Sequence, residues 1–185
     1  MAARSDRTRT ALLDAAAEVL SRKPRATLAD IATAAGVGRA TLHRHFKSRD
    51  DLVQTLAKHA LDQTDEACSH IDYYNQAASV SLRQTLEAIV PLGSRYAFLS
   101  YQNISERDDG PIAAQLRRQG EQLRELVVAA RDEGMFAPEV SVAWIVATID
   151  ALIYAAWNTV SDGSVAPNDV TDLIMRTLTR GLAAG

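Results

Sequence analysis

The stretch 27–46, TLADIATAAGVGRATLHRHF, predicts two short helices joined by a tight turn. Thr27 precedes the first helix and Asp30 follows three residues later, which is the arrangement of a capping box. Gly36 ends that helix, because glycine adopts the left-handed conformation of the C′ position without a steric penalty. Two helices of this length joined in this way are typical of a helix-turn-helix unit.

The second of these helices is predicted to carry polar donors opposite its apolar face. Leu42 and Phe46 lie four residues apart and form the apolar face. The other side presents Arg39, Thr41, His43, Arg44 and His45. A short helix with this many hydrogen-bond donors suits the major groove of DNA, where the base edges offer acceptors. We therefore expect 27–46 to read DNA.

Basic residues gather in the first part of the chain. Residues 1–50 contain ten Lys or Arg against five Asp or Glu, a net charge of +5, whereas residues 51–185 carry −8. The formal net charge of the whole chain is −3, which by itself argues against a nucleic-acid-binding protein. The asymmetry favours a basic DNA-binding domain at 1–50 and an acidic domain at 51–185 that stays off the phosphates.

Composition and periodicity predict an all-α protein. Hydrophobic residues make up 47% and charged residues 23% of the 185 residues, as in a soluble globular protein with a sizeable core. Apolar residues recur at helical spacing along most of the chain, which predicts about nine helices. The first helix is expected over 8–20, after a frayed basic arm, and the fourth from a cap at Ser48 to beyond Cys68.

Several classes of protein are not expected from the residues present. The single cysteine, Cys68, excludes an internal disulfide and gives no metal cluster. The chain has no Gly-rich phosphate loop and no G-x-S-x-G motif, so we expect no enzyme activity, cofactor or metal. No apolar segment of a signal peptide is present near the N-terminus, so we expect a cytoplasmic protein.

Two apolar helices are predicted to end the chain, at 141–160 and 168–182. The first is apolar nearly all round, and a chain of this length offers few other helices to cover it. A membrane span is the alternative, but Asp150 and many small residues favour a buried helix of a bundle. We therefore expect the two helices to form half of a four-helix interface in a homodimer.

Roughly the first sixty residues resemble the DNA-binding domain of TetR-type (tetracycline-repressor-like) transcriptional regulators. The resemblance is carried by TLADIATAAGVGRATLHRHFKSRDDL, residues 27–52, and a domain of this type reaches about residue 64 of the next helix. The layout of three N-terminal helices, a long fourth helix, a helical body and two apolar closing helices also fits. His43 departs from the pattern, since the family usually has a tyrosine there that contacts a phosphate; an imidazole can make that contact or point elsewhere.

The resemblance implies a regulator, most often a repressor, that is released from a palindromic operator by a small molecule. It implies base contacts from positions that face the groove, here Arg39, Ala40, Thr41 and Arg44. It implies phosphate contacts from Thr27, His43, His45, Lys47 and Arg49. Plainer roles stay open for these residues: a helix cap for Thr27, packing for His45, and solvated charges at the start of the fourth helix.

The resemblance also implies a ligand pocket within 51–185. The sequence offers only candidates for its lining, and the aromatic ones are equally suited to the core: Tyr96, Tyr101, Arg124, Trp144, Asp150, Tyr154 and Trp157. Asp150 is the most informative, because a carboxylate midway along an apolar helix must be paired, solvated or turned to a cavity. It would bind a cationic ligand or take part in a dimer contact.

Two further classes of function remain open at this stage. A helical interaction protein could keep the N-terminal domain without binding DNA, although the +5 charge and the donor-rich helix argue against this. A carrier or enzyme could use a cavity in the second domain, although the missing catalytic motifs argue against it.

Overall fold

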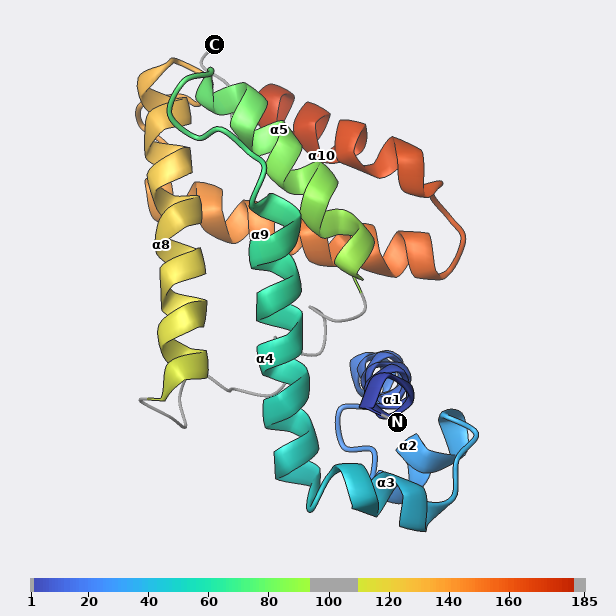
Figure 1. Ribbon diagram of the computed structural model, residues 1–185. Coiled ribbons are helices and arrows are strands. Elements are labelled where there is room, and N and C mark those ends of the chain that lie inside the picture. Colours follow the sequence, from blue (N-terminus) through green and yellow to red (C-terminus); the bar gives the residue numbers. More distant parts are fainter. Residues whose placement is uncertain (1, 94–109, 182–185) are drawn as a thin grey trace. The chain divides into compact units, whose positions relative to one another are not determined.

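The computed structural model describes residues 2–93 and 110–181, and the side chains within 8–93 and 110–181. These residues form helices and no strands, so the predicted all-α class is confirmed (Figure 1). They contain 8 α-helices, close to the predicted count, and one short 3₁₀ helix. The elements are α1 (Ala2–Arg22), α2 (Leu28–Ala34), α3 (Arg39–His45), α4 (Arg49–Cys68), α5 (Ala78–Ile89), η1 (Val90–Leu92), α8 (Pro111–Asp132), α9 (Val142–Ser161) and α10 (Pro167–Gly181).

The chain divides into two compact units, which we call the head and the body. Among the described residues, the head comprises 2–62 and 110–113, and the body comprises 63–93 and 114–181. The division falls within α4, after Asp62, and within α8, after Ala113. Both helices therefore contribute residues to both units, whereas the functional boundary proposed from the sequence at residue 50 stays a prediction.

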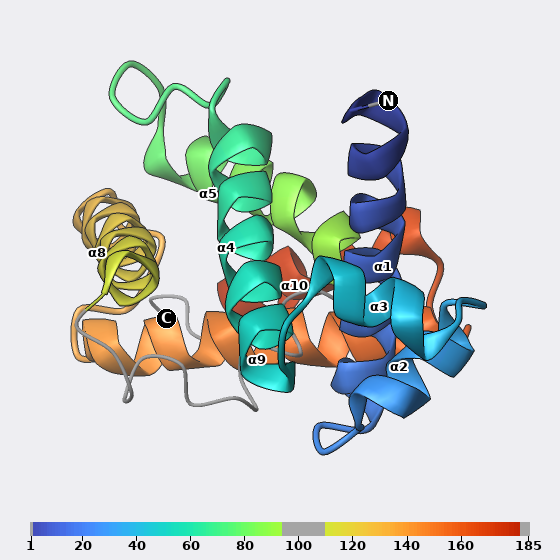
Figure 2. The same cartoon turned by 60° about the horizontal axis from the view of Figure 1, so that its bottom comes forward.

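The head is built around one apolar core to which its four helices α1 to α4 contribute. Ile31, Leu42 and Phe46 have no exposed surface, and α1, α2 and α3 lie together as a group (Figure 2). The buried cluster consists of Leu12, Leu13, Ala16, Ala17, Leu20, Ala26, Ile31, Ala32, Leu42, Phe46, Leu52, Val53, Leu56 and Ala57. Because Leu42 and Phe46 point into this core, the opposite side of α3 faces away from it.

The predicted local geometry between α2 and α3 is confirmed. The backbone N–H of Asp30 donates to the Thr27 hydroxyl over 3.2 Å, and the Thr27 N–H donates to the Asp30 carboxylate over 2.8 Å. Gly36 follows α2 with φ of 65°, the left-handed conformation that a side chain would strain. The N–H of Val37 then donates back to the Ala32 carbonyl over 3.0 Å, which closes the turn.

The predicted start of the first helix was wrong. The sequence interpretation placed a frayed arm before residue 8, but α1 begins at Ala2 and continues to Arg22. No glycine or proline interrupts this stretch, and alanine and arginine are among the strongest helix formers. The helix therefore extends for almost three turns before Leu12, its first residue in the head core.

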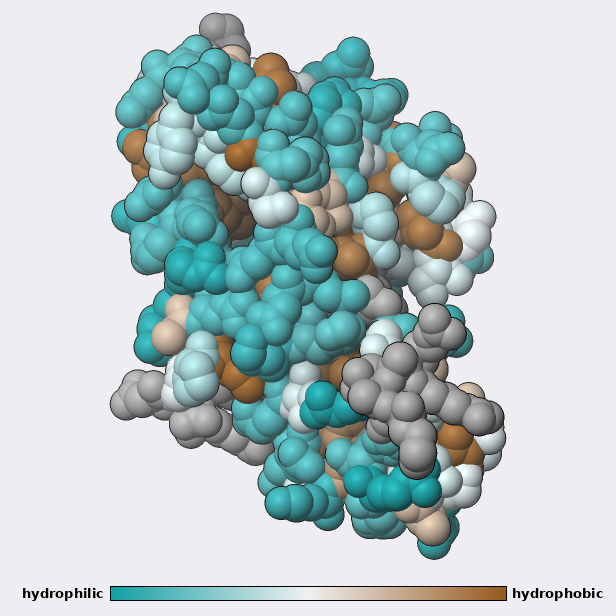
Figure 3. All heavy atoms as spheres, viewed as in Figure 1, coloured by the Kyte–Doolittle hydropathy of each residue, from teal (hydrophilic) through white to brown (hydrophobic). Residues whose placement is uncertain are grey.

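The predicted start of α4 is confirmed and its predicted end was wrong. The N–H of Asp51 donates to the Ser48 hydroxyl over 3.1 Å, so Ser48 caps the helix as expected. The helix ends at Cys68 because the Asp72 carboxylate accepts the N–H groups of Tyr74 and Asn75, each over 3.0 Å. Between these ends the outward side of α4 is hydrophilic (Figure 3).

The body has its own core, formed where α5, α9 and α10 lie against one another (Figure 1). The end of α8 completes it with Leu126, Val127 and Ala130. Polar contacts support this packing at the periphery. The Glu133 carboxylate accepts the first N–H of α5, that of Ala78, over 2.9 Å, and Arg83 of α5 pairs with Asp172 of α10 over 2.5 Å. The cap matters because α5 lacks a capping side chain of its own.

The residues that the structure describes cover only one side of α9. Its fully buried face consists of Ile145, Ile149, Ile153 and Ala156. The exposed side carries an alanine at every fourth position, namely Ala143, Ala147, Ala151 and Ala155. Trp144 beside them is 62% exposed. By length and composition alone α9 could also span a membrane, a property that core helices of helical bundles share.

Trp157 of α9 packs directly on the backbone at Gly93, which follows η1. A Cβ atom at Gly93 would lie 2.2 Å from Trp157 Cδ1, well inside van der Waals contact. Gly120, in the exposed middle of α8, has no atom within 4 Å of the corresponding position. The two glycines therefore differ in their need for a missing side chain.

We predict opposite effects for the two glycine substitutions. Gly93→Ala should lower the free energy of unfolding by about 1–3 kcal/mol, because the indole ring must shift out of a packed site. Gly120→Ala should raise it by about 0.5–1 kcal/mol, because alanine is the better helix former and nothing opposes its methyl group. Urea unfolding monitored by circular dichroism measures both, and a Gly93→Ala variant as stable as the parent would contradict the packing argument.

Candidate nucleic-acid interface

The outer side of α3 presents the donors that the sequence predicted. Arg39, Ala40, His43 and Arg44 are exposed, and Lys47 is exposed just beyond the helix. Thr41 is half-buried. Three of these residues carry a positive charge, and within the described side chains Arg39, Arg44 and Lys47 have no ion pair. A helix whose inner side is locked into the core and whose outer side offers unpaired cations suits insertion into a DNA groove.

An open hollow lies beside this surface. It measures about 360 Å³ and is lined by Thr27, Leu28, Ala29, Arg39, Leu42, His43 and Arg49. Four of the predicted contact residues, Thr27, Arg39, His43 and Arg49, thus surround one depression between the starts of α2, α3 and α4. Two guanidinium groups at its rim make the hollow suitable for a phosphate group.

Arg49 has a structural contact that the sequence did not indicate. Its Nη2 donates to the Pro24 carbonyl over 2.6 Å and its Nε to the Ala26 carbonyl over 3.1 Å. The side chain is half-buried and joins the start of α4 to the loop between α1 and α2. Two of its five N–H groups are used in this way, so the residue predicted to bind phosphate also holds the head together.

The Thr27 hydroxyl is engaged within its own capping box. It donates to the Asp30 carboxylate over 2.9 Å and accepts the Asp30 N–H. The Asp30 carboxylate also accepts the Thr27 N–H, and the hydrogen bonds from this N–H and from the Thr27 hydroxyl lower the pKa of the carboxyl, so it stays charged at neutral pH. A phosphate contact from this hydroxyl would have to replace or share the bond to Asp30, and it stays a prediction.

His45 lies at the end of α3 among packed groups. Its Nε2 is buried and has no hydrogen-bond partner among the described residues. The ring lies 6.3 Å from that of Phe46, and the Arg9 guanidinium lies 5.8 Å from the centre of the Phe46 ring. These contacts join α1 to the end of α3 by a cation–π interaction, and they are compatible with the packing role that the sequence left open for His45.

The ligand candidates are only partly brought together. Asp150, Tyr154 and Trp157 lie on one side of α9, because successive residues of a helix are about 100° apart. Trp144 lies about 120° around the helix from Asp150. Arg124 is exposed on α8 and pairs with Glu121 over 3.9 Å. Tyr96 and Tyr101 lie outside the described residues.

Asp150 is the unusual member of this set. Its carboxylate has no hydrogen bond or ion pair with any residue that the structure describes, and the residue is exposed on α9. The surrounding protein atoms remove water from the carboxylate and raise its pKa. An unpaired carboxylate beside apolar groups is a candidate for binding a cation.

Metal binding finds no support in the part of the chain that the structure describes. There, no group of three or more His, Cys, Asp or Glu side chains is placed to hold a metal ion. Cys68 is half-buried, and burial raises the pKa of its thiol, so it is a poor nucleophile at neutral pH.

Comparison with known proteins agrees with the geometry of the head. Residues 12–56 match the family model of the bacterial regulatory proteins, tetR family. The chain is 36% identical over 177 residues to the HTH-type transcriptional repressor LfrR of Mycolicibacterium smegmatis, covering 96% of this chain and 91% of LfrR. The crystal structure of LfrR from Mycobacterium smegmatis in complex with proflavine matches with a TM-score of 0.74 and 34% identity, over 97% of this chain and 98% of that chain. The HTH-type transcriptional regulator NfxB of Pseudomonas aeruginosa is 48% identical over 60 residues, 31% of this chain and 32% of NfxB.

The fold and the exposed α3 surface define a helix-turn-helix regulator of transcription that binds DNA. With relatives this similar over nearly its whole length, the chain belongs to the TetR family of bacterial regulatory proteins. Regulators of this family bind operator DNA as dimers, bind small molecules and are generally not enzymes. We therefore do not adopt the interaction-protein and carrier alternatives.

We predict that substitution of Arg49 lowers stability, whereas substitution of Arg44 weakens DNA binding. Arg49→Ala should lower the free energy of unfolding by about 2 kcal/mol, because two half-buried carbonyls lose a charged donor. Arg44→Ala should leave stability unchanged and weaken binding to an operator duplex recovered from random-sequence DNA, with a loss of about 1–3 kcal/mol. Urea unfolding and fluorescence polarisation measure the two effects; unchanged operator affinity in Arg44→Ala would remove the role assigned to it.

Proposed function

We propose that this protein is a homodimeric repressor that is released from a palindromic operator by a small molecule. The observation that carries the proposal is the exposed basic side of α3, whose inner side is fixed by the buried Leu42 and Phe46. LfrR, similar over nearly the whole chain, is a repressor and has been crystallised with a bound small molecule. We infer that transcription is regulated in the cytoplasm.

Within the interface, we assign base reading to α3 and backbone contacts to the residues around the hollow. Arg39 and Arg44 have the planar donors that match guanine O6 and N7, and Ala40 and Thr41 offer methyl groups to thymine. Lys47, Arg49, His43 and Thr27 would meet phosphates, and His45 would support the end of α3. In a dimer, two α3 helices would enter successive major grooves roughly 34 Å apart.

We place the dimer interface on α9 and α10. The alanine row of α9 lets a second helix approach closely, and Trp144 together with Leu173 of α10, 40% exposed, supplies larger apolar groups beside it. An exposed apolar side on an otherwise amphipathic bundle is costly unless another surface covers it. A second copy of the same two helices covers it symmetrically and forms a four-helix interface.

We propose that the effector is a cationic aromatic molecule. Asp150 is an unpaired, desolvated carboxylate, and Tyr154 and Trp157 lie on the same side of α9. Such a group attracts a cation, and the aromatic rings suit a planar ligand by stacking or by cation–π contact. Proflavine, which LfrR binds in its crystal structure, has this chemistry and is the natural first probe.

Operator binding should depend strongly on salt. Phosphate contacts release counterions, so affinity for the recovered operator should fall about 10³-fold between 50 mM and 200 mM salt. Lys47→Gln should reduce the slope of log affinity against log salt by about two, one for each head of the dimer. Fluorescence polarisation at several salt concentrations measures both. A flat response would contradict the proposed interface.

Asp150→Asn should weaken ligand binding without weakening the fold. The raised pKa means that the ionised Asp150 carboxylate destabilises the folded state as pH rises, so the neutral amide should keep or raise the melting temperature at pH 7. Proflavine affinity, measured by fluorescence titration, should fall about tenfold or more because the ligand loses its counter-charge. Glu139→Gln, at an exposed site before α9, is the matched control and should change neither quantity.

An Asp150→Asn variant with unchanged proflavine affinity would contradict the assignment of this residue. A lower melting temperature would contradict the argument that the carboxylate costs stability.

A further inference from the structure

α4 and α8 are the two described helices that contribute residues to both the head and the body. The division of the chain falls after Asp62 in α4 and after Ala113 in α8. Asp65 lies one turn beyond the first point, and Gln115 lies two residues beyond the second. Among the helices that the structure describes, a change in the body can therefore reach the head through this short region of α4 or α8.

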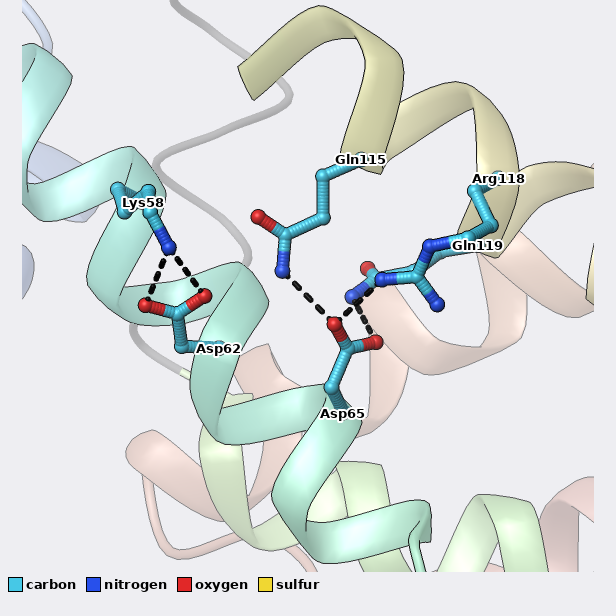
Figure 4. Close-up of polar contacts among 6 residues, drawn as sticks. All are labelled: Lys58, Asp62, Asp65, Gln115, Arg118 and Gln119. Carbon is cyan, nitrogen blue, oxygen red and sulfur yellow. Dashed lines mark hydrogen bonds and ion pairs between the residues drawn. The ribbon is translucent and has the colours of Figure 1, made fainter. Parts of the chain in front are cut away.

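The two helices are joined here by a group of polar side chains, which we call the Asp65 clasp: Asp65, Gln115, Arg118 and Gln119. Asp65 projects from α4 between three donors of α8 (Figure 4). Its Oδ2 accepts Gln115 Nε2 over 2.8 Å and Arg118 Nη2 over 2.5 Å, and its Oδ1 accepts Gln119 Nε2 over 2.8 Å. The three donors are at positions i, i+3 and i+4 of α8, so one face of the helix supplies them all.

The clasp keeps its charge at neutral pH. Partial burial raises the pKa of the Asp65 carboxyl, but the hydrogen bonds from Arg118, Gln119 and Gln115 outweigh it, so the pKa is lowered overall. The carboxylate therefore stays ionised over the physiological range. A carboxylate bound by three donors on a single helix face has one favourable register against that helix.

Apolar packing joins α8 to the head core near the start of the helix, where Ile112 packs against the buried cluster. The residues of α4 in the buried cluster of the head end at Ala57, and the buried cluster of the body contains no residue of α4. Leu61 is buried, but it belongs to neither cluster. Around Asp65, the hydrogen bonds of the clasp join the last turns of α4 to α8.

We propose that the Asp65 clasp is the joint that positions α4 relative to α8, and that it transmits ligand binding in the body to the DNA-binding head. This inference rests on the proposed release of the operator by a ligand. Half-exposed ion pairs contribute little to stability, so the consequence of the clasp is the register that it imposes on α4. Asp65 and Arg118 are positioning residues, since they act through α4 and do not touch DNA.

The test compares Asp65→Asn with Asp62→Asn in the full-length protein. Both remove one negative charge from α4, three residues apart, but the ion pair of Asp62 is with Lys58 of the same helix (Figure 4). Operator affinity is measured by fluorescence polarisation with and without proflavine. The ratio of the two dissociation constants is the coupling between ligand and operator, and typical couplings are about 5–150-fold.

If the clasp transmits the signal, the ratio of the operator dissociation constants with and without proflavine should fall to less than about threefold in Asp65→Asn. The same ratio should stay at the wild-type value in Asp62→Asn. Proflavine affinity should persist in both. The exchanged pair Asp65→Arg with Arg118→Asp should restore part of the coupling, because both glutamine amides can turn their oxygen atoms towards an arginine. A merely structural role would lower proflavine affinity as well, whereas the clasp predicts that this affinity persists. An equal ratio in Asp65→Asn and Asp62→Asn would overturn the proposal.

If proflavine does not change the operator affinity of the wild-type protein, the proposed effector is contradicted. The clasp is then tested without ligand. Amide hydrogen exchange over residues 63–68 and ligand-free operator affinity then decide. Faster exchange together with an affinity changed about threefold or more in Asp65→Asn, relative to Asp62→Asn, supports the clasp. Equal amide exchange and equal ligand-free operator affinity in Asp65→Asn and Asp62→Asn would overturn the proposal.

Discussion

The burial of Leu42 and Phe46 is the constraint on which the account of DNA binding depends. Both side chains are fully enclosed by the head core, so α3 has a single allowed rotation about its own axis. That rotation turns Arg39, His43 and Arg44 outward. The capping box at Thr27 and the left-handed Gly36 set the path into α3, and Arg49 holds the loop before α2. Specificity for DNA thus begins with apolar packing on the opposite side of the same helix.

The body differs from the head, because several of its features cost stability within a single chain. α9 leaves a row of alanines and Trp144 exposed, and Asp150 keeps an unpaired carboxylate in desolvating surroundings. We propose that another molecule covers each feature and makes it favourable: a second subunit for the alanine row, and a cation for Asp150.

Sequence patterns predicted the contacts between near neighbours and missed those between distant residues. The capping box of α2, the turn at Gly36 and the cap at Ser48 each lie within a few residues, and all three were predicted. The end of α4 was missed because Asp72 forms its turn with backbone groups that no side-chain pattern marks. The Arg49 contacts and the Asp65 clasp join residues more than twenty positions apart, and the only available signal was a polar residue on a half-buried helix face.

The most direct test of the central claim is a hydroxyl-radical footprint of the protein on the recovered operator. Two identical heads, each with α3 in a major groove, predict two protected patches related by the symmetry of the site. Their centres should lie about one helical turn, roughly 10 base pairs, apart or a multiple of this. A single protected patch, or protection that is uniform and independent of sequence, would contradict a dimeric regulator that reads a palindromic operator.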